Sequence, residues 1–205
     1  MEKLKLPFSL DNKELALIDD RLKEFKILNK KGSNEWFSEL CFCLLTANSK
    51  AQTAIKIQDY LAPQGFIDKN ESQLAEIIRS FGHRFHNTKA KYIVLARKYI
   101  DIKNVLKEYL KISTEVARDF LVKNIKGLGY KEASHFLRNI GYSDVAIIDR
   151  HIIRFLYKYK LIEYIPKIIN KKIYLELEAI LKKFNIALDK LDLILWYHMT
   201  GKILK

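Results

Sequence analysis

The sequence predicts an all-α protein, and three observations support this prediction. Glycine and proline are scarce, with seven and three in 205 residues, which leaves little room for the tight turns of a many-stranded sheet. Apolar residues recur at helical spacing along most of the chain. Repeats and low-complexity segments are absent from the sequence. The length suits one domain or two small lobes.

Amphipathic patterning predicts the first two helices. Residues 11–30 are expected to form one helix, whose apolar face consists of Leu15, Ile18, Leu22 and Phe25. Ser33 or Asn34 is expected to cap the second helix. The run WFSELCFCLLTAN in this helix is apolar almost all round, which is typical of a helix in the middle of a bundle.

Four further elements follow from the same patterns. The sequence APQG at residues 62–65 predicts a turn, and residues 71–81 predict a short helix. Apolar side chains at helical spacing predict another helix that contains Tyr92, Leu95, Ala96, Tyr99 and Ile100. The last predicted helices span residues 171–184 and 189–199.

A helix-hairpin-helix is predicted at about residues 118–140. The helical pattern stops at Gly127-Leu128-Gly129 and resumes at Ala133. Two glycines around one apolar residue allow a tight turn, and amides exposed at the start of the second helix bind a phosphate without reading base sequence. For the turn taken alone, an ordinary helical hairpin is the alternative.

Lys131 lies in the first turn of the second hairpin helix, two residues after Gly129. A neutral lysine amine is a nucleophile that forms Schiff bases, and neighbouring cations together with partial desolvation favour the neutral form. A lysine that contacts a phosphate or solvent is the alternative interpretation.

Asp149 follows the apolar run 145–148 and precedes a second amphipathic pattern. This position is typical of a helix N-cap. A capping carboxylate is also held ionised by the helix dipole, and a fixed negative charge is what a developing sugar cation requires. Both interpretations are kept for Asp149.

Taken together, residues 122–151 resemble a known signature, a helix-hairpin-helix followed by a Gly/Pro-rich loop and an aspartate. It belongs to the base-excision DNA glycosylase superfamily, in which this chain is most similar to the type-2 8-oxoguanine DNA glycosylase/AP lyases of archaea and some bacteria. The family's catalytic lysine and aspartate fall on Lys131 and Asp149, and His151 stands two residues beyond. One departure is Lys126, which replaces the usual proline and loosens the turn but adds a cation.

The resemblance implies a two-lobed helical DNA glycosylase fold with a central DNA-binding cleft. One lobe would be the middle bundle, residues 37–130, and the other would combine residues 1–36 and 131–205. It also implies a bifunctional mechanism on a nucleotide that is flipped out of the duplex. Lys131 would attack C1′, Asp149 would support the cationic sugar, and the Schiff base would undergo β-elimination.

Further site residues follow from the resemblance. A base pocket would comprise Phe85, Trp196 and Lys205, with Lys205 using its carboxylate or its amine. The alternatives are that Phe85 and Trp196 lie in the core and Lys205 in solvent. DNA contacts are expected from Asn48, Arg84, Lys126, Gly127, Gly129, Arg150, His151 and Arg154. Asn48 could instead end one helix while Ser49 starts the next.

No cofactor is expected to be required, apart from a Na⁺ or K⁺ ion that the family often holds on hairpin carbonyls. Here these would be the carbonyls of Lys123, Ile125 and Leu128. Some glycosylases of this superfamily carry a four-cysteine iron-sulfur cluster. With Cys41 and Cys43 as its only cysteines, this sequence cannot form one.

Charge and hydropathy limit the classes of partner that the protein can bind. A net charge of +13 is the footprint of a nucleic-acid binder, although an acidic protein or a membrane surface would also fit charge alone. The sequence predicts neither a transmembrane segment nor a signal peptide. We therefore expect a cytoplasmic, nucleoid-associated monomer that acts on duplex DNA containing 8-oxoguanine or an AP site. A glycosylase for another lesion and a non-catalytic DNA-binding module are the alternatives.

Overall fold

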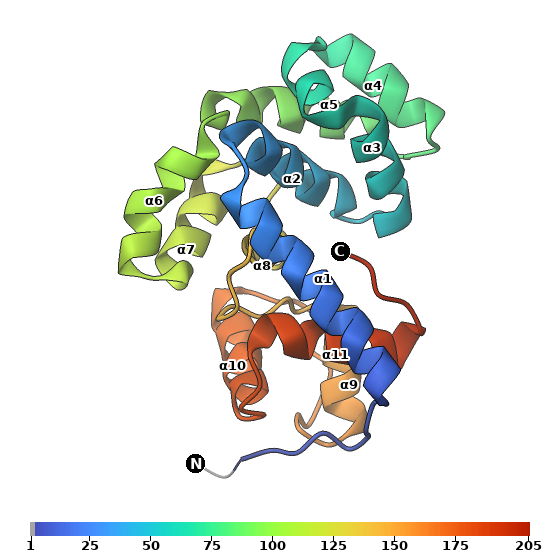
Figure 1. The fold of residues 1–205 in the computed structure, drawn as a ribbon, viewed down its shortest axis with the longest axis vertical. Coiled ribbons are helices and arrows are strands. Elements are labelled where there is room, and N and C mark those ends of the chain that lie inside the picture. Colours follow the sequence, from blue (N-terminus) through green and yellow to red (C-terminus); the bar gives the residue numbers. More distant parts are fainter. Residues whose placement is uncertain (1–2) are drawn as a thin grey trace.

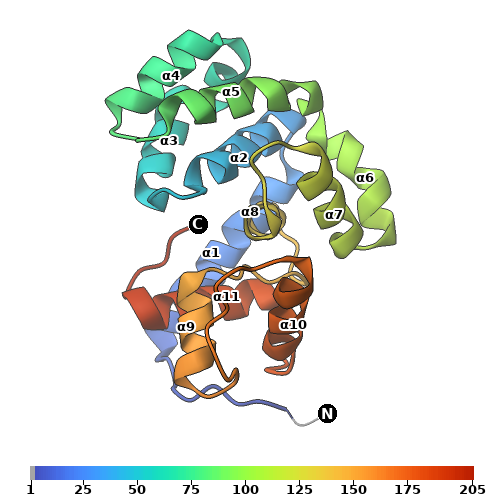
Figure 2. The same ribbon diagram turned by 180° about the vertical axis from the view of Figure 1, so that it is seen from behind.

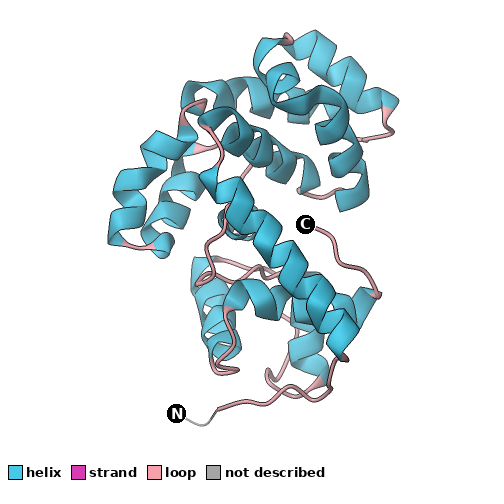
Figure 3. Ribbon diagram, in the orientation of Figure 1, coloured by secondary structure: helices cyan, strands magenta, loops and turns pink. Residues whose placement is uncertain are grey.

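A computed structural model describes residues 3–205, and within this range every regular element is a helix (Figure 3). The all-α prediction is confirmed. The elements, in chain order, are α1 (Asn12–Lys30), α2 (Ser33–Thr46), α3 (Ala51–Asp68), α4 (Glu71–Ser80), α5 (His86–Ala96), the short 3-10 helix η1 (Arg97–Tyr99), α6 (Ile102–Ile112), α7 (Thr114–Asn124), α8 (Tyr130–Asn139), α9 (Arg150–Lys158), α10 (Lys171–Lys182) and α11 (Leu188–Thr200).

Two helical bundles are visible in the fold, with α1 and α8 between them (Figures 1 and 2). The first core contains buried side chains from α2 to α8, and the second contains buried side chains of α9, α10 and α11. Ile18 and Phe25 of α1 pack with Leu193 and Ile194 of α11 in a third cluster. No helix of residues 3–205 is long and apolar enough to cross a membrane.

The packing of α8 bears on the predicted lobe limits. Its apolar residues Ala133, Phe136 and Leu137 belong to the first core. The boundary between the first and the second core therefore falls between Val145 and Ala146 in the sequence. The division into one lobe of residues 37–130 and another of residues 1–36 and 131–205 remains a prediction.

The second helix is buried as its composition predicted. Every side chain from Trp36 to Thr46 of α2 is buried, and α2 packs against α3, α5, α6 and α8. The predicted cap is wrong, because Gly32 is the N-cap residue and provides no side-chain bond. The Ser33 hydroxyl instead donates to the Asp101 carboxylate, so a tertiary contact replaces the local one.

The turn predicted at residues 62–65 is found as a kink at Ala62, where two helices that together make α3 meet. Ala62 has a φ of +49° and a ψ of 179°. The extended ψ fits the proline that follows, because the Pro63 ring disfavours a helical conformation in the preceding residue. Helix then resumes, because proline is tolerated in a first helical turn.

The hairpin joins α7 to α8 through a turn that only glycine suits at one position. Gly127 has a φ of +95°, and a Cβ added there would lie 2.3 Å from the ring of Tyr92. Leu128 is buried and anchors the turn in the first core. Gly129 is the N-cap of α8 in an extended conformation, which other residues also adopt.

A buried ion pair connects the hairpin to the second bundle. The Arg118 guanidinium of α7 donates to both carboxylate oxygens of Glu178 of α10, at 2.6 and 3.0 Å. The Glu178 carboxylate also accepts the backbone amide of Ala146 at 2.8 Å. Arg118 is 1% exposed and Glu178 2%. A bidentate pair of this kind fixes the geometry of its partners as well as their charge.

Tyr174 of α10 holds the same loop. Its hydroxyl donates to the Ala146 carbonyl at 2.7 Å and accepts the Ile148 amide at 3.1 Å. Burial raises the pKa of Tyr174 well above its usual value, so the hydroxyl stays protonated. The loop that leads to Asp149 is therefore tied to α10 by both Tyr174 and Glu178.

Gly127→Ala is expected to destabilise the protein by about 2 kcal/mol or more, because it adds backbone strain and a clash with Tyr92. The measurement is urea unfolding. Gly82→Ala is the matched control, since Gly82 also has a positive φ but has no atom within 4 Å of an added Cβ. Equal losses for the two variants would rule out the contact with Tyr92.

Tyr174→Phe is expected to cost about 1–3 kcal/mol of unfolding free energy, because it leaves buried backbone groups of Ala146 and Ile148 without a partner. Tyr130→Phe serves as the control. The Tyr130 hydroxyl donates to Asp119 at a partly exposed site, where water can replace it. A loss for Tyr174→Phe no larger than that of the control would contradict this account of the loop.

Candidate active site and nucleic-acid interface

Lys131 is the second residue of α8, directly beyond the hairpin turn. Its side chain is one-third exposed, and its amine lies 3.5 Å from a carboxylate oxygen of Glu132. The N-terminus of α8 carries the positive end of the helix dipole, which attracts phosphate. Lys131 thus combines partial burial with access to a ligand at this helix end.

Asp149 is the N-cap of α9, so the capping interpretation is confirmed. Its Oδ1 accepts the amides of His151 and Ile152 at 2.8 and 2.9 Å. Both cap bonds use this one oxygen, so capping does not require Oδ2. The cap holds the carboxylate in place, and this is compatible with the catalytic role that the sequence also suggested.

Asp192 of α11 connects these two residues electrostatically. The pKa of Asp192 is raised to about 6, chiefly by burial and also by the negative charge of Asp149, while the positive charges of Arg138 and Lys131 oppose the rise. Arg138 donates to Asp192 Oδ2 at 2.8 Å. Lys131 and Asp149 therefore both influence the pKa of this one carboxyl group. Sequence reasoning missed Asp192, whose neighbours in the chain give no sign of this role.

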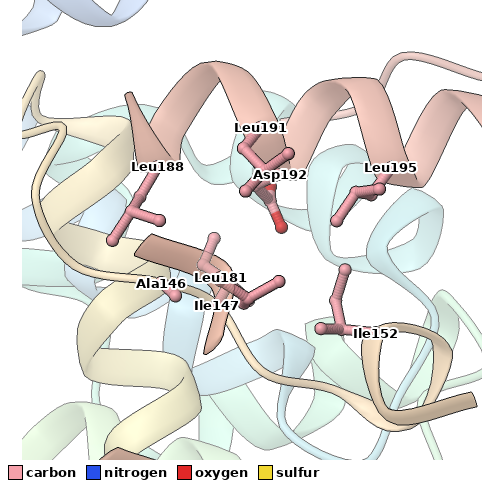
Figure 4. A pocket seen from close by; sticks show the side chains of 8 residues that line it. All are labelled: Ala146, Ile147, Ile152, Leu181, Leu188, Leu191, Asp192 and Leu195. Atoms are coloured by element: carbon pink, nitrogen blue, oxygen red, sulfur yellow. The ribbon is translucent and has the colours of Figure 1, made fainter. Parts of the chain in front are cut away.

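The void beside Asp192 is too small for a nucleobase. Asp192 is the one polar residue among its lining side chains, and its carboxyl group points into the space between them (Figure 4). The cavity volume is about 10 Å³, barely the space that one water molecule needs. A base would have to bind elsewhere.

Lys89 of α5 is a second amine near the hairpin that sequence reasoning missed. It is only 5% exposed. The pKa of Lys89 is lowered to about 8, chiefly by burial and also by the positive charge of Lys131, while Glu132 opposes the fall. Its position one helical turn beyond Phe85 was the available signal.

Phe85 is exposed, so the core alternative for this residue is wrong. Its ring is 39% exposed at the N-cap of α5, and the Arg84 guanidinium lies 4.6 Å from the ring centroid. The Phe85 amide donates to His83, whose other ring nitrogen contacts the Leu45 carbonyl. His83 thus anchors a loop that presents a cation and an aromatic ring together.

Trp196 of α11 packs against His151, with ring centroids 5.1 Å apart at a steep angle. Trp196 is partly buried, and its Nε1 has no hydrogen-bond partner within residues 3–205. Beside this pair is an open pocket of about 330 Å³, lined by His151, Arg154, Phe155, Lys158, Tyr159, His198 and Met199. Its cations suit a phosphate-bearing ligand.

Lys205 lies against α2, so the alternative that places its side chain in solvent is wrong. Its amine donates to Glu39 at 2.9 Å and lies 4.5 Å from the ring centroid of Phe42. The last residues leave α11 and cross to the first bundle (Figure 2). Within the described residues, no ring contact joins Phe85 to Trp196, so the structure brings Trp196 and His151 together but not Phe85.

The remaining predicted DNA contacts are distributed over the surface. Lys126, Arg150 and Arg154 are exposed. Asn48 is exposed too, with a φ of +59° just after α2 ends, and this conformation is one that asparagine tolerates. Asn48 therefore ends the helix and is also accessible. Both interpretations of this residue are structurally compatible.

The hairpin backbone is a partial match for a monovalent cation. The Ile125 carbonyl already accepts the Leu128 amide at 3.2 Å, and a carbonyl oxygen has a second lone pair for an ion. Residues 3–205 contain no group of three or more His, Cys, Asp or Glu side chains that could hold a metal. Any ion at the hairpin would thus depend on backbone oxygens.

Known proteins resemble this chain over nearly its whole length. The 8-oxoguanine DNA glycosylase/AP lyase of Methanocaldococcus jannaschii is 50% identical over 201 residues, 96% of each chain. The enzyme of that name from Aquifex aeolicus is 42% identical and covers 92% of each chain. A crystal structure of the M. jannaschii glycosylase/lyase with a 15mer DNA containing 8-oxoguanine has a TM-score of 0.88 at 49% identity, covering 93% of this chain and 92% of that one.

Another solved structure agrees. The 8-oxoguanine DNA glycosylase of Thermotoga maritima has a TM-score of 0.87 at 41% identity, with 94% of this chain and 93% of that one covered. The model of the family described as 8-oxoguanine DNA glycosylase matches residues 18–190, which include the hairpin, Lys131 and Asp149. The chain therefore belongs to the 8-oxoguanine DNA glycosylase family.

Proposed function

We propose that this chain excises 8-oxoguanine from duplex DNA through a Schiff base on Lys131 and then cleaves the AP site by β-elimination. As a member of its family it is a DNA glycosylase and AP lyase. The observation that carries the proposal is the placement of Lys131 and Asp149 at two helix N-termini, near one buried carboxyl group.

The residues divide the chemistry between them. Lys131 Nζ gives up a proton to Asp149 and attacks C1′ of the flipped nucleotide. The bond between C1′ and the base breaks, and the base departs with the bonding electrons and takes up a proton. The sugar ring opens to an imine on Lys131. Loss of a C2′ proton then expels the 3′ phosphate and nicks the strand.

The base pocket would use the two aromatic residues and the end of the chain. Phe85 offers an exposed ring face for stacking, and Trp196 lies beside His151. The Lys205 amine is occupied by Glu39, so the terminal carboxylate is the group left for the base. A carboxylate accepts hydrogen bonds and therefore matches the N–H groups on a purine edge.

DNA would lie between the two bundles and against the cations of the hairpin and α9. Lys126, Arg150 and Arg154 would contact backbone phosphates, with Asn48 at the space that the flipped nucleotide leaves. A Na⁺ or K⁺ ion would be held by the carbonyls of the hairpin. The active form would be a monomer associated with the nucleoid.

Lys131→Gln is expected to abolish strand cleavage, because glutamine cannot form a Schiff base, while DNA affinity changes little. The measurement is borohydride trapping on duplexes with one 8-oxoguanine or one abasic site. Lys111→Gln, on the exposed face of α6, is the control and should still trap.

The trapping outcomes separate the alternatives. Adducts on both duplexes support the proposal. An adduct on the abasic duplex alone would point to another lesion, and none on either would favour a DNA-binding module. Wild-type trapping by Lys131→Gln would assign the nucleophile to another amine, with Lys89 as the nearest candidate.

Deleting Lys205 is expected to slow 8-oxoguanine release more than AP-site cleavage, since only the first step requires recognition of a base. Single-turnover rates on the two duplexes measure this difference. Equal slowing of both steps would remove the chain end from base recognition.

A further inference from the structure

Glu39 is a buried carboxylate in the middle of α2, where an apolar residue would be expected. It is 2% exposed and accepts hydrogen bonds from three separate segments. The donors are Lys205 Nζ at 2.9 Å, Gln58 Nε2 at 3.1 Å and Asn139 Nδ2 at 2.5 Å. A buried charge is tolerated when it is paired and hydrogen-bonded in this way.

Further hydrogen bonds continue from this cluster toward the active site. Asn139 accepts the Arg138 Nε–H at 3.0 Å, and Arg138 donates to Asp192 at 2.8 Å. One unbroken path of polar contacts therefore joins Lys205, through α2 and α8, to the Asp192 carboxyl group of α11.

The path determines which part of Lys205 is free. The segment leaves α11 at Gly201, whose φ of +67° turns the chain, and runs to α2. Glu39 and the Phe42 ring together hold the Lys205 ammonium. The segment of residues 201–205 is thus fixed at Lys205, although terminal segments usually fray.

We infer that Glu39 is a positioning residue for base recognition, which acts by holding the Lys205 ammonium and so fixing Lys205 for its contact with the damaged base. This rests on the proposed role of Lys205. An apolar residue in place of Glu39 would suit the buried helix, because buried ion pairs seldom add net stability. What the pair adds is a single geometry for the end of the chain.

Glu39→Gln tests the inference, since it keeps the shape but removes the charge that holds the ammonium. In single-turnover assays, release of 8-oxoguanine should fall roughly tenfold or more, the effect of losing one charge-assisted hydrogen bond. Cleavage of a pre-formed AP site should change about tenfold less than base release. A loss of fold alone would lower both rates together.

Lys205→Met is the complementary variant, because it keeps the terminal carboxylate but loses the ammonium. It should slow base release as Glu39→Gln does, and the double variant should be no slower than either single variant. Losses that multiply in the double variant would show that Glu39 acts through some group other than Lys205.

Digestion with carboxypeptidase B, which removes C-terminal basic residues, tests the contact between Lys205 and Glu39 independently of enzymatic activity. Glu39→Gln should release Lys205 at least several-fold faster than wild type. Tyr174→Phe is the control for destabilisation, because it removes buried hydrogen bonds in the other core. Its Lys205 should be released no faster than that of wild type.

The two readouts separate the possible failures. Faster digestion with normal base release would leave the contact standing and overturn the role of Lys205 in recognition. Unchanged digestion and unchanged base release of Glu39→Gln would overturn the inference itself while leaving the Schiff-base chemistry intact.

Discussion

The buried ion pair of Arg118 and Glu178 is the interaction on which the site depends. Arg118 lies in the helix before the hairpin, and Glu178 also binds the amide of Ala146, three residues before Asp149. The pair thereby sets the register between the hairpin and the loop that carries the aspartate. Arg138 and Asp192 add a second directional contact between α8 and α11, whereas the apolar contacts around them are not directional.

The candidate site combines two helix N-termini with buried ionisable side chains. Lys131 lies in the first turn of α8, and Asp149 is the N-cap of α9. The helix dipole at such N-termini favours negative charge, and this helps to fix the Asp149 carboxylate. Burial raises the pKa of Asp192 and lowers the pKa of Lys89, which favours the uncharged form of each. Groups of this kind weaken a fold, and they concentrate where a protein handles charge and protons.

Local sequence patterns predict most of the helices, but two predictions made from them differ from the structure. The hairpin, the buried character of α2 and the cap at Asp149 all follow from neighbouring residues, and each is found in the structure. The cap predicted at Ser33 failed because its hydroxyl bonds to Asp101, far away in the sequence. The turn predicted at residues 62–65 is narrower than expected, a kink at Ala62, since proline is tolerated in the first turn of the helix that follows.

The sequence by itself determined the helical class, the hairpin and the two candidate catalysts, because these depend on residues close together in the chain. Only the tertiary structure decided which groups surround them. Lys205 reaches Glu39 across 166 positions, and Arg138 reaches Asp192 across 54. Pairs so far apart leave no periodic signal in one sequence, since their contact depends on how whole helices pack. The placement of Lys205 against α2 and the polar path from Glu39 to Asp192 are therefore products of the fold.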